Sequence, residues 1–358
     1  MRPIVSHLFR PATALFAALA VGFVFLLLSG KDALQAYEVL LTAPVTRLAR
    51  AGRWLEASSV YILAGLSILA PYRARLLNFS LVAQTAAGAL AAYVTFVLVQ
   101  WPDTLALIAA SIAAALAGAL IACIPGWLKA YLGANEILTG LMLNPIVDGL
   151  IAIGIDPLFR LVGWLGAARI QERGEPFGFA KIADISALDT GTLHTGVLLT
   201  PLACIAIWLL FSRTPLGYEI RMAGASEKFA RYGGIPVRRS IVLAFALGGA
   251  CAGLAGAHMA LGHPGDLYIA TQGLTFDGIT VALIAQANPV AAPVAGLLYG
   301  YLVVGADYME IRTSSGQELI RVIQGLVVLF AIVRVWRIQS TRGHARKSGR
   351  DRDGRRDG

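Results

Sequence analysis

Long apolar runs without charged side chains constrain the fold of this 358-residue chain more than any other feature. Residues 12–30 contain no charged residue, and residues 241–262 contain none if His258 is neutral. About 20 apolar residues in a helix cross the roughly 30 Å hydrocarbon core of a bilayer. Charged residues make up only 14% of the chain, against roughly 25% in soluble domains. We therefore predict an all-α, polytopic membrane helical bundle.

The hydropathy pattern predicts about ten transmembrane helices in one domain over residues 1–336. Residues 337–358 are rich in Arg, Gly and Asp, and we expect them to form a disordered basic tail that can contact anionic membrane lipid. The predicted spans cover residues 11–29, 57–72, 76–100, 103–127, 137–154, 194–212, 241–262, 274–287, 289–306 and 318–336.

Two segments depart from this regular pattern. Residues 32–56 are more polar, and the near-helical spacing of their apolar side chains predicts one helix that lies in the membrane interface. Residues 274–287 are short for a full crossing. We expect them to form a bent or incomplete pair with the next span at the Asn288-Pro289 break.

The placement of Lys and Arg predicts the orientation. If the N-terminus is inside, ten crossings place the C-terminus inside too, and 20 of the 30 basic residues then lie in inside segments. This bias agrees with the positive-inside rule and predicts an N-in, C-in topology. Residues 213–240 then form a cytoplasmic loop, and residues 155–193 form an extracytoplasmic loop.

Several functional classes find no support in the sequence. It has no G-x-x-x-x-G-K-[ST] loop, no H-E-x-x-H and no C-x-x-C pair, so we predict no catalytic residues, no metal site and no cofactor. Cys123, Cys204 and Cys251 lie in apolar stretches and are interpreted as core residues. His258 and His263 are interpreted as packed or interfacial side chains rather than metal ligands. The net charge of +9 is explained by orientation, so nucleic-acid binding is not expected.

The loop over residues 213–240 contains signals for a short helix. Ser226 can cap a helix that starts at Glu227, Gly233 or Gly234 can end it, and Pro236 prevents its continuation. Such a helix would present Phe229, Ala230 and Tyr232, with Lys228 and Arg231 close by. These residues fit a docking element for a partner, and they fit an ordinary cytoplasmic connector equally well.

This loop resembles the coupling segment of permease subunits of ABC importers for branched-chain amino acids, simple sugars and nucleosides. The family pattern is roughly T-x-x-G-x-x-x-R-A-x-G-x-N-x-x-A-A-x-x-x-G-I. Ser226 replaces the usual Asn, and Phe229 replaces an Ala. Residues 132–137 (L-G-A-N-E-I) and 142–144 (M-L-N) resemble a motif of the nucleoside-type branch. The residues that fit the coupling pattern are Thr214, Gly217, Arg221, Gly224, Ala230, Gly234 and Ile235.

The resemblance implies a multi-pass subunit in a bacterial inner membrane that does not hydrolyse ATP itself. Its partners would be an ABC ATPase, a second homologous permease and an extracytoplasmic substrate-binding lipoprotein. The segment that contacts the ATPase would comprise Arg221, Gly224, Ser226, Glu227, Phe229, Ala230, Arg231, Tyr232, Gly234 and Ile235.

Polar side chains within apolar segments are candidates for lining a translocation path, because such groups usually face the interior of a bundle. The alternative for each Asn or Gln is an interhelical hydrogen bond, and Asn135 can instead cap the following span. Asp277 is the sharpest candidate, since a membrane acid must hydrate or pair, with Arg312 or Arg321 as possible partners. The candidates are Asn78, Gln84, Asn135, Asn144, Asp277, Thr280 and Asn288.

We therefore expect a permease for nucleosides, with simple sugars as the alternative cargo within the same family. A secondary transporter or channel that works without an ATPase is the alternative class. Such proteins use intramembrane charges as coupling sites. Few candidates for that role exist here beyond Asp148 and Asp277, which disfavours this alternative.

Overall fold

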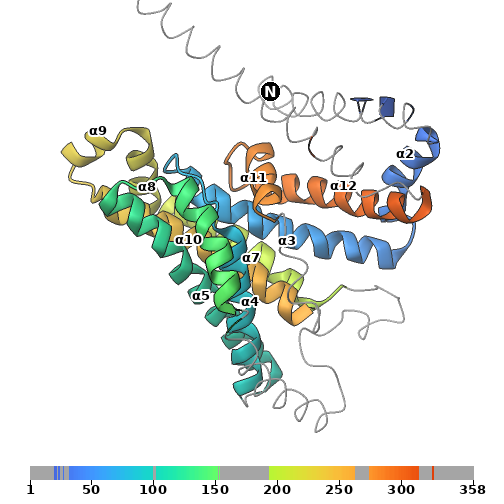
Figure 1. Cartoon of the computed structure of the whole chain (residues 1–358), viewed down its shortest axis with the longest axis horizontal. Helices are drawn as coiled ribbons and strands as arrows, with labels where there is room; N and C mark the ends of the chain where they lie inside the picture. The colour runs from blue at the N-terminus through green and yellow to red at the C-terminus, as the bar shows by residue number, and fades with distance from the viewer. Residues whose placement is uncertain are drawn as a thin grey trace, which may run out of the picture. The chain divides into compact units, whose positions relative to one another are not determined.

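The computed structural model describes residues 32–99, 102–151, 193–262 and 274–313, together with isolated residues between 20 and 27 and at 153 and 325. The predicted spans over 11–29 and 318–336, the loop over 155–193 and the tail over 337–358 lie wholly or largely outside the described residues. The regular elements within these ranges are α-helices and short 3₁₀ turns (Figure 1). This confirms the all-α prediction.

Six of the described helices are long and apolar enough to cross a membrane, as expected for a polytopic bundle. They are α3 (Leu48–Tyr72), α4 (Leu81–Leu98), α5 (Asp103–Leu132), α7 (Leu199–Arg213, preceded by the 3₁₀ turn η3 over Thr195–Leu198), α10 (Val237–Gly262) and α12 (Ala292–Thr313). A further helix covers residues 136–151.

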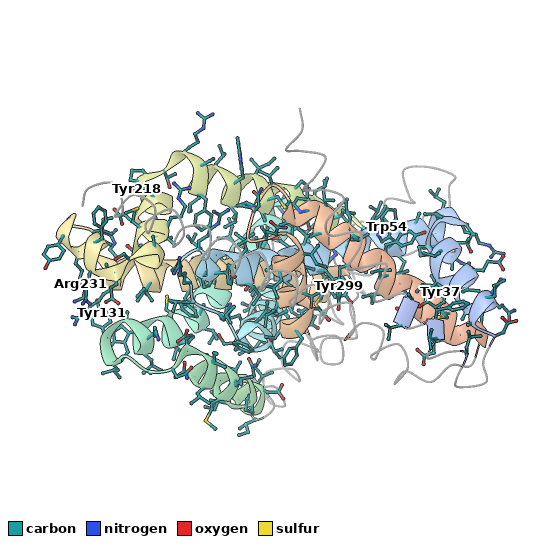
Figure 2. The ribbon with its side chains drawn as sticks, turned by 90° about the horizontal axis from the view of Figure 1, so that it is seen from above. Tyr37, Trp54, Tyr131, Tyr218, Arg231 and Tyr299 are labelled. Carbon is teal, nitrogen blue, oxygen red and sulfur yellow. The ribbon has the colours of Figure 1, made fainter. Side chains whose placement is uncertain are left out.

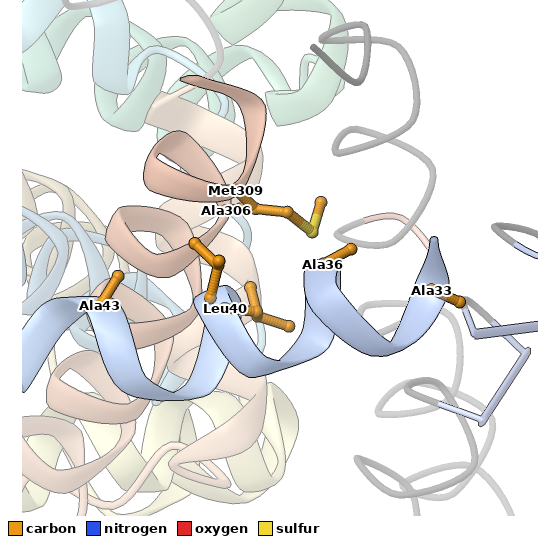
Figure 3. Packing of buried hydrophobic residues seen from close by; sticks show 7 residues of the cluster. Ala33, Ala36, Leu40, Ala43, Ala306 and Met309 are labelled. Atoms are coloured by element: carbon orange, nitrogen blue, oxygen red, sulfur yellow. The ribbon is translucent and has the colours of Figure 1, made fainter. Parts of the chain in front are cut away.

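The chain divides into two compact units. One unit runs from Val45 to Tyr301, and we call it the central unit. The other combines the residues up to Pro44 with those from Leu302 onward. In the second unit, α2 (Ala33–Thr42) buries one face against the last turns of α12. Figure 3 shows the small contact residues Ala33, Ala36 and Ala43 beside Leu40, and Met309 facing them.

The prediction of one helix over residues 32–56 is wrong, because the chain leaves the helical path twice. Asp32 caps α2, which ends at Thr42 and is followed by the 3₁₀ turn η1 (Ala43–Val45). Pro44 lacks a backbone N–H and restricts the residue before it. Arg47 is then extended, with φ −138° and ψ 145°, and α3 begins at Leu48. Residues 48–56, which the sequence predicted to lie in the membrane interface, therefore form the first turns of the membrane-length helix α3.

The core of the central unit is built on α10, which packs against α5, α4 and α3 (Figure 1). Small residues make these contacts possible. A Cβ added at Gly253 would lie 2.0 Å from the carbonyl oxygen of Ala114, and one at Gly249 would lie 2.3 Å from that of Gly118. The G-x-x-x-G pair on α10 thus lets the backbones of α10 and α5 approach to a distance that a side chain would prevent.

The segment after residue 273 confirms the prediction of a short helix followed by a break. α11 (Leu274–Ile284) has 11 residues, about 17 Å of helix, which is too short to cross the hydrocarbon core. Gln286 and Ala287 then adopt positive φ angles of 51° and 54°. The side chain of Asn288 accepts a hydrogen bond from the Val290 N–H at 3.1 Å, and α12 starts at Ala292.

The close contact at Gly253 makes a testable prediction. Gly253→Ala should lower the stability of the full chain in detergent by about 1–3 kcal/mol, because the added methyl overpacks the α10–α5 contact. Gly149→Ala is the matched control. It lies in the helix over residues 136–151, and an added Cβ there meets nothing within 4 Å. Thermal unfolding of the two variants checks this, and equal stabilities would contradict it.

Candidate functional site

Two short helices occupy the loop predicted over residues 213–240. The first of them, α8, covers Pro215–Ala225. Thr214 is its N-cap, and the Thr214 hydroxyl accepts a hydrogen bond from the Gly217 N–H at 3.2 Å. Sequence reasoning missed α8, although Thr at the N-cap followed by Pro at the first helical position is a recognised start signal. The span after the loop also begins earlier than predicted, at Val237.

α9 (Glu227–Tyr232) confirms the predicted capped helix. The hydroxyl of Ser226 accepts a hydrogen bond from the Phe229 N–H at 3.3 Å. Gly233 follows the helix, and Gly234 has a φ of 75°, a conformation that glycine adopts at little cost. Glu227 and Arg231 form an i,i+4 ion pair at 2.5 Å. Because both side chains are exposed, this pair contributes little to stability.

The residues of the predicted coupling segment divide into an exposed group and a buried group. Tyr232 is 93% exposed and Phe229 is 63% exposed, so two large aromatic side chains of one short helix lack packing partners in the described part of this chain. Figure 2 shows Arg231 of α9 and Tyr218 of α8 at the same end of the ribbon. The exposed residues of the segment are Ser226, Glu227, Phe229, Arg231, Tyr232 and Gly234. Ile235 is half-buried.

The remaining residues of the segment, Arg221, Gly224 and Ala230, face the rest of the protein and fix the position of α8 and α9. The guanidinium of Arg221 donates a hydrogen bond to the carbonyl of Phe211 at the end of α7. Gly224 lies so close to the turn after α3 that an added Cβ would be 2.5 Å from the Arg73 carbonyl oxygen. Ala230 is fully buried. These contacts attach α8 and α9 to the ends of membrane-length helices.

Asn78 and Gln84 form a buried amide pair rather than isolated polar groups. The Asn78 amide donates to the Gln84 side-chain oxygen at 2.7 Å, and the Gln84 amide donates back to the Asn78 side-chain oxygen at 2.9 Å. Asn78 also donates to the Ser67 hydroxyl at 3.1 Å, and Gln84 donates to the Ser80 hydroxyl at 2.6 Å. Both residues form hydrogen bonds, but these are not interhelical in the predicted sense, because Asn78 lies in the segment between α3 and α4 and Gln84 bonds to Asn78 and Ser80 near the start of its own helix. The bond from Asn78 to Ser67 connects this segment to α3.

Three further candidates bond to nearby backbone. Asn144 donates to the Phe79 carbonyl at 3.0 Å and accepts from the Ala83 N–H at 3.1 Å, which ties its helix to the start of α4. Asn135 accepts from the Ile137 N–H at 2.9 Å, consistent with the capping alternative. Thr280 donates to a carbonyl of its own helix, that of Phe276, at 2.8 Å.

Asp277 on α11 has a partner that the sequence did not suggest. The phenol of Tyr299 on α12 donates to its carboxylate at 2.6 Å. The Tyr61 ring on α3 meets the Tyr299 ring edge to face, with centroids 5.1 Å apart. Tyr299, labelled in Figure 2, thus contacts both α11 and α3 from its place on α12. The proposed partner Arg321 lies outside the described residues. A tyrosine 22 positions away gives no local sequence signal, so only the tertiary structure reveals this pair.

A cavity of about 290 Å³ opens between α3, α7 and α12 in the central unit. Sequence reasoning did not find it, because most of its lining residues look like ordinary span residues. Ser59 and Thr200 supply polar atoms, and the Thr200 hydroxyl lies 3.4 Å from the Ser59 carbonyl oxygen. The lining residues are Leu55, Ser59, Ile62, Val197, Thr200, Pro201, Cys204, Ile205, Pro293 and Leu297.

Comparison with known protein families gives a match over most of this architecture. The model of the family described as branched-chain amino acid transport system, permease component, matches residues 51–332. The matched range contains α8, α9 and every membrane-length helix described above, apart from the first three residues of α3.

Individual relatives are similar over nearly the whole chain. The guanosine ABC transporter permease of Bacillus subtilis is 28% identical over 356 residues, covering 96% of this chain and 98% of its own. The glucose ABC transporter permease of Haloferax volcanii is 31% identical and covers 90% of this chain and 86% of its own. The nucleoside ABC transporter permease of Lactococcus lactis is 26% identical, with 90% coverage of each chain.

The amide pair predicts non-additive substitutions. Asn78→Leu alone should cost about 1–3 kcal/mol beyond the packing change, because it leaves the buried Gln84 amide without its reciprocal partner. Adding Gln84→Leu should recover part of that loss. Thermal unfolding of both single variants and the double variant measures the coupling. Additive losses, or lowered uptake with unchanged stability, would contradict a structural role for the pair.

Proposed function

Since the chain belongs to the family of branched-chain amino acid transport system permease components, we propose that it is the transmembrane subunit of an ATP-driven importer for nucleosides. As a permease component, it is a transport subunit and not an enzyme. Nucleosides are supported by two relatives named for guanosine and nucleoside transport. The motif over residues 132–144, which resembles the nucleoside-type branch, adds to this support.

Simple sugars are the second candidate cargo. The relative named as a glucose permease is 31% identical over 331 residues, a similarity comparable with that of the nucleoside permeases. Transport assays with competing nucleosides and sugars separate the two candidates. Inhibition of labelled nucleoside uptake by unlabelled nucleosides, and not by glucose, is the result that supports nucleosides.

The exposed surface of α9 supports coupling to a separate ABC ATPase. It combines two exposed aromatic side chains, Phe229 and Tyr232, with the basic residues Lys228 and Arg231. Aromatic and Arg side chains are enriched at protein interfaces and dominate their energetics. Ala230 is buried beneath this surface and holds the helix to the protein. Closure of the ATPase dimer would push on α9, and α8 would transmit that motion to α7 and α10.

The complete importer in this proposal has four kinds of subunit. This chain crosses the inner membrane about ten times, with both termini in the cytoplasm, and pairs with a second homologous permease. An extracytoplasmic lipoprotein delivers the cargo. Much of the selectivity then belongs to that lipoprotein, so Asn78, Gln84 and Asn144 need not contact the cargo. The basic tail over residues 337–358 lies at the cytoplasmic surface, near anionic lipid.

A secondary transporter that works without an ATPase is a less suitable candidate. Such proteins use membrane acids that exchange ions or protons with the path. Asp277 accepts a hydrogen bond from Tyr299, which fits an acid used for helix–helix packing. Uptake that persists after ATP depletion with the ion gradient intact would favour this alternative.

The α9 surface gives the sharpest functional test. Phe229→Ala combined with Tyr232→Ala should reduce copurification of the ATPase and ATP-dependent uptake at least tenfold, because interface aromatics often contribute about 2 kcal/mol or more each. Trp208→Ala is the matched control, since Trp208 is an exposed aromatic residue on α7 and not on α8 or α9.

Replacement of residues 227–232 by a Gly-Ser linker extends this test. It should abolish uptake while leaving the permease folded, because α9 has only one buried side chain, that of Ala230. Retained ATPase binding and uptake in the linker variant would show that α9 is only a connector.

A further inference from the structure

Three potential metal ligands from distant parts of the sequence meet inside the central unit. Glu56 lies on α3, His194 caps η3, and His258 lies on α10. Their ligand atoms all lie within 4.8 Å of one another. The Nε2 atom of His194 is 3.8 Å from Oε1 of Glu56, and the rings of His194 and His258 have centroids 4.5 Å apart. We call these three residues the Glu–His–His cluster.

We propose that the Glu–His–His cluster binds a divalent transition-metal ion, with zinc as the best-fitting ion. Two imidazoles and one carboxylate form an ordinary zinc ligand set, which leaves a fourth position for water. Imidazole ligands favour zinc, copper and nickel over magnesium and calcium, which take oxygen ligands. His258 is 1% exposed, so it is packed as the sequence predicted. The proposal adds a ligand role, which the sequence-based interpretation did not consider because it took His258 without Glu56 and His194.

Burial distinguishes this cluster from chance groupings on a surface. His194 and His258 are each 1% exposed, and Glu56 is 9% exposed. A bound cation would place an opposite charge beside the buried Glu56 carboxylate and so stabilise its ionised form. Two neutral imidazoles would add two ligands without further charge, and water would take the fourth position.

The contacts of His194 show what must change in this residue when an ion binds. Its Nδ1 accepts a hydrogen bond from the Gly196 N–H at 3.2 Å, which directs Nε2 toward Glu56. Gly262, at the end of α10, leaves room for this ring, since an added Cβ would lie 2.1 Å from Nε2. Coordination through Nε2 places the ring proton on Nδ1. The long hydrogen bond from Gly196 would therefore break when the ion binds.

Metal binding would connect three membrane-length segments. Zinc–nitrogen bonds of about 2.0–2.1 Å place tetrahedral ligand atoms roughly 3.4 Å apart, so the cluster must contract on loading. The contraction would draw the start of α3, the end of α10 and the segment that leads into α7 together. The topology in the proposed function, on which this point alone rests, places these ends at the extracytoplasmic face.

Zinc binding to the purified full chain tests the proposal. The affinity tag is removed, metal is stripped with a chelator, and zinc is added back by equilibrium dialysis and counted by mass spectrometry. One zinc ion per chain is expected. Glu56→Gln, His194→Gln and His258→Gln should each weaken binding by at least about tenfold. His7→Gln and His344→Gln are matched controls that should leave binding unchanged.

A second measurement uses the wild-type chain and so does not depend on the folding of any variant. X-ray absorption at the zinc edge of the wild-type chain should show two imidazoles and oxygen ligands. Substoichiometric zinc, a spectrum without imidazole scattering, or equal binding by folded cluster variants would overturn the proposal and identify the metal as adventitious. None of these outcomes bears on ATPase binding by α9, so the metal site and the proposed function can fail separately.

Discussion

The close approach of α10 to α4 and α5 is the constraint on which the rest of the central unit depends. Carbonyl oxygens of α5 occupy the space that a Cβ atom at position 249 or 253 would need. On the other flank, a Cβ at Gly256 would lie 2.2 Å from the Thr85 carbonyl oxygen of α4. In a bilayer, lipid tails are as apolar as side chains, so close packing replaces the hydrophobic effect as the force that holds helices together.

This packed core gives the exposed α9 helix a firm attachment. α8 bonds to the ends of α7 and α10 through Arg221 and Glu219 and lies against the turn after α3. Force that α9 passes to α8 would therefore act on three membrane-length helices. Ser226 and Gly234 fix where α9 begins and ends, while Arg221 and Gly224 fix where the pair of helices sits. A short helix with only one buried side chain would otherwise have little reason to keep its position.

Local patterns predicted those features that depend on neighbouring residues. The apolar runs gave the membrane helices, the Ser226 and Gly233 signals gave α9, and the Asn288-Pro289 break marked the end of a short helix. Prediction failed over residues 32–56, where near-helical spacing concealed the break at Pro44 and Arg47. It also missed α8, although Thr214 and Pro215 carried its start signal. The period of apolar residues does not by itself say where a helix is interrupted.

Tertiary relationships were beyond this kind of reasoning. Tyr299 bonds to Asp277, and Glu56, His194 and His258 converge from positions up to about 200 residues apart. Asn78 and Gln84, identified as polar groups in apolar segments, bond to each other across only six positions, and the bond from Asn78 to Ser67 of α3 is the more distant contact. The sequence indicated which side chains needed partners, but it could not identify those partners, because interhelical contacts depend on how the bundle packs.

The central claim is that α9 is the surface through which this permease engages its ATPase. Site-specific photo-cross-linking from position 232 in the assembled transporter tests it most directly, with a cross-linker at position 208 on α7 as the reference. A covalent adduct between position 232 and the ATPase subunit, with none from position 208, is the predicted result. Absence of that adduct, or equal cross-linking from both positions, would contradict the claim.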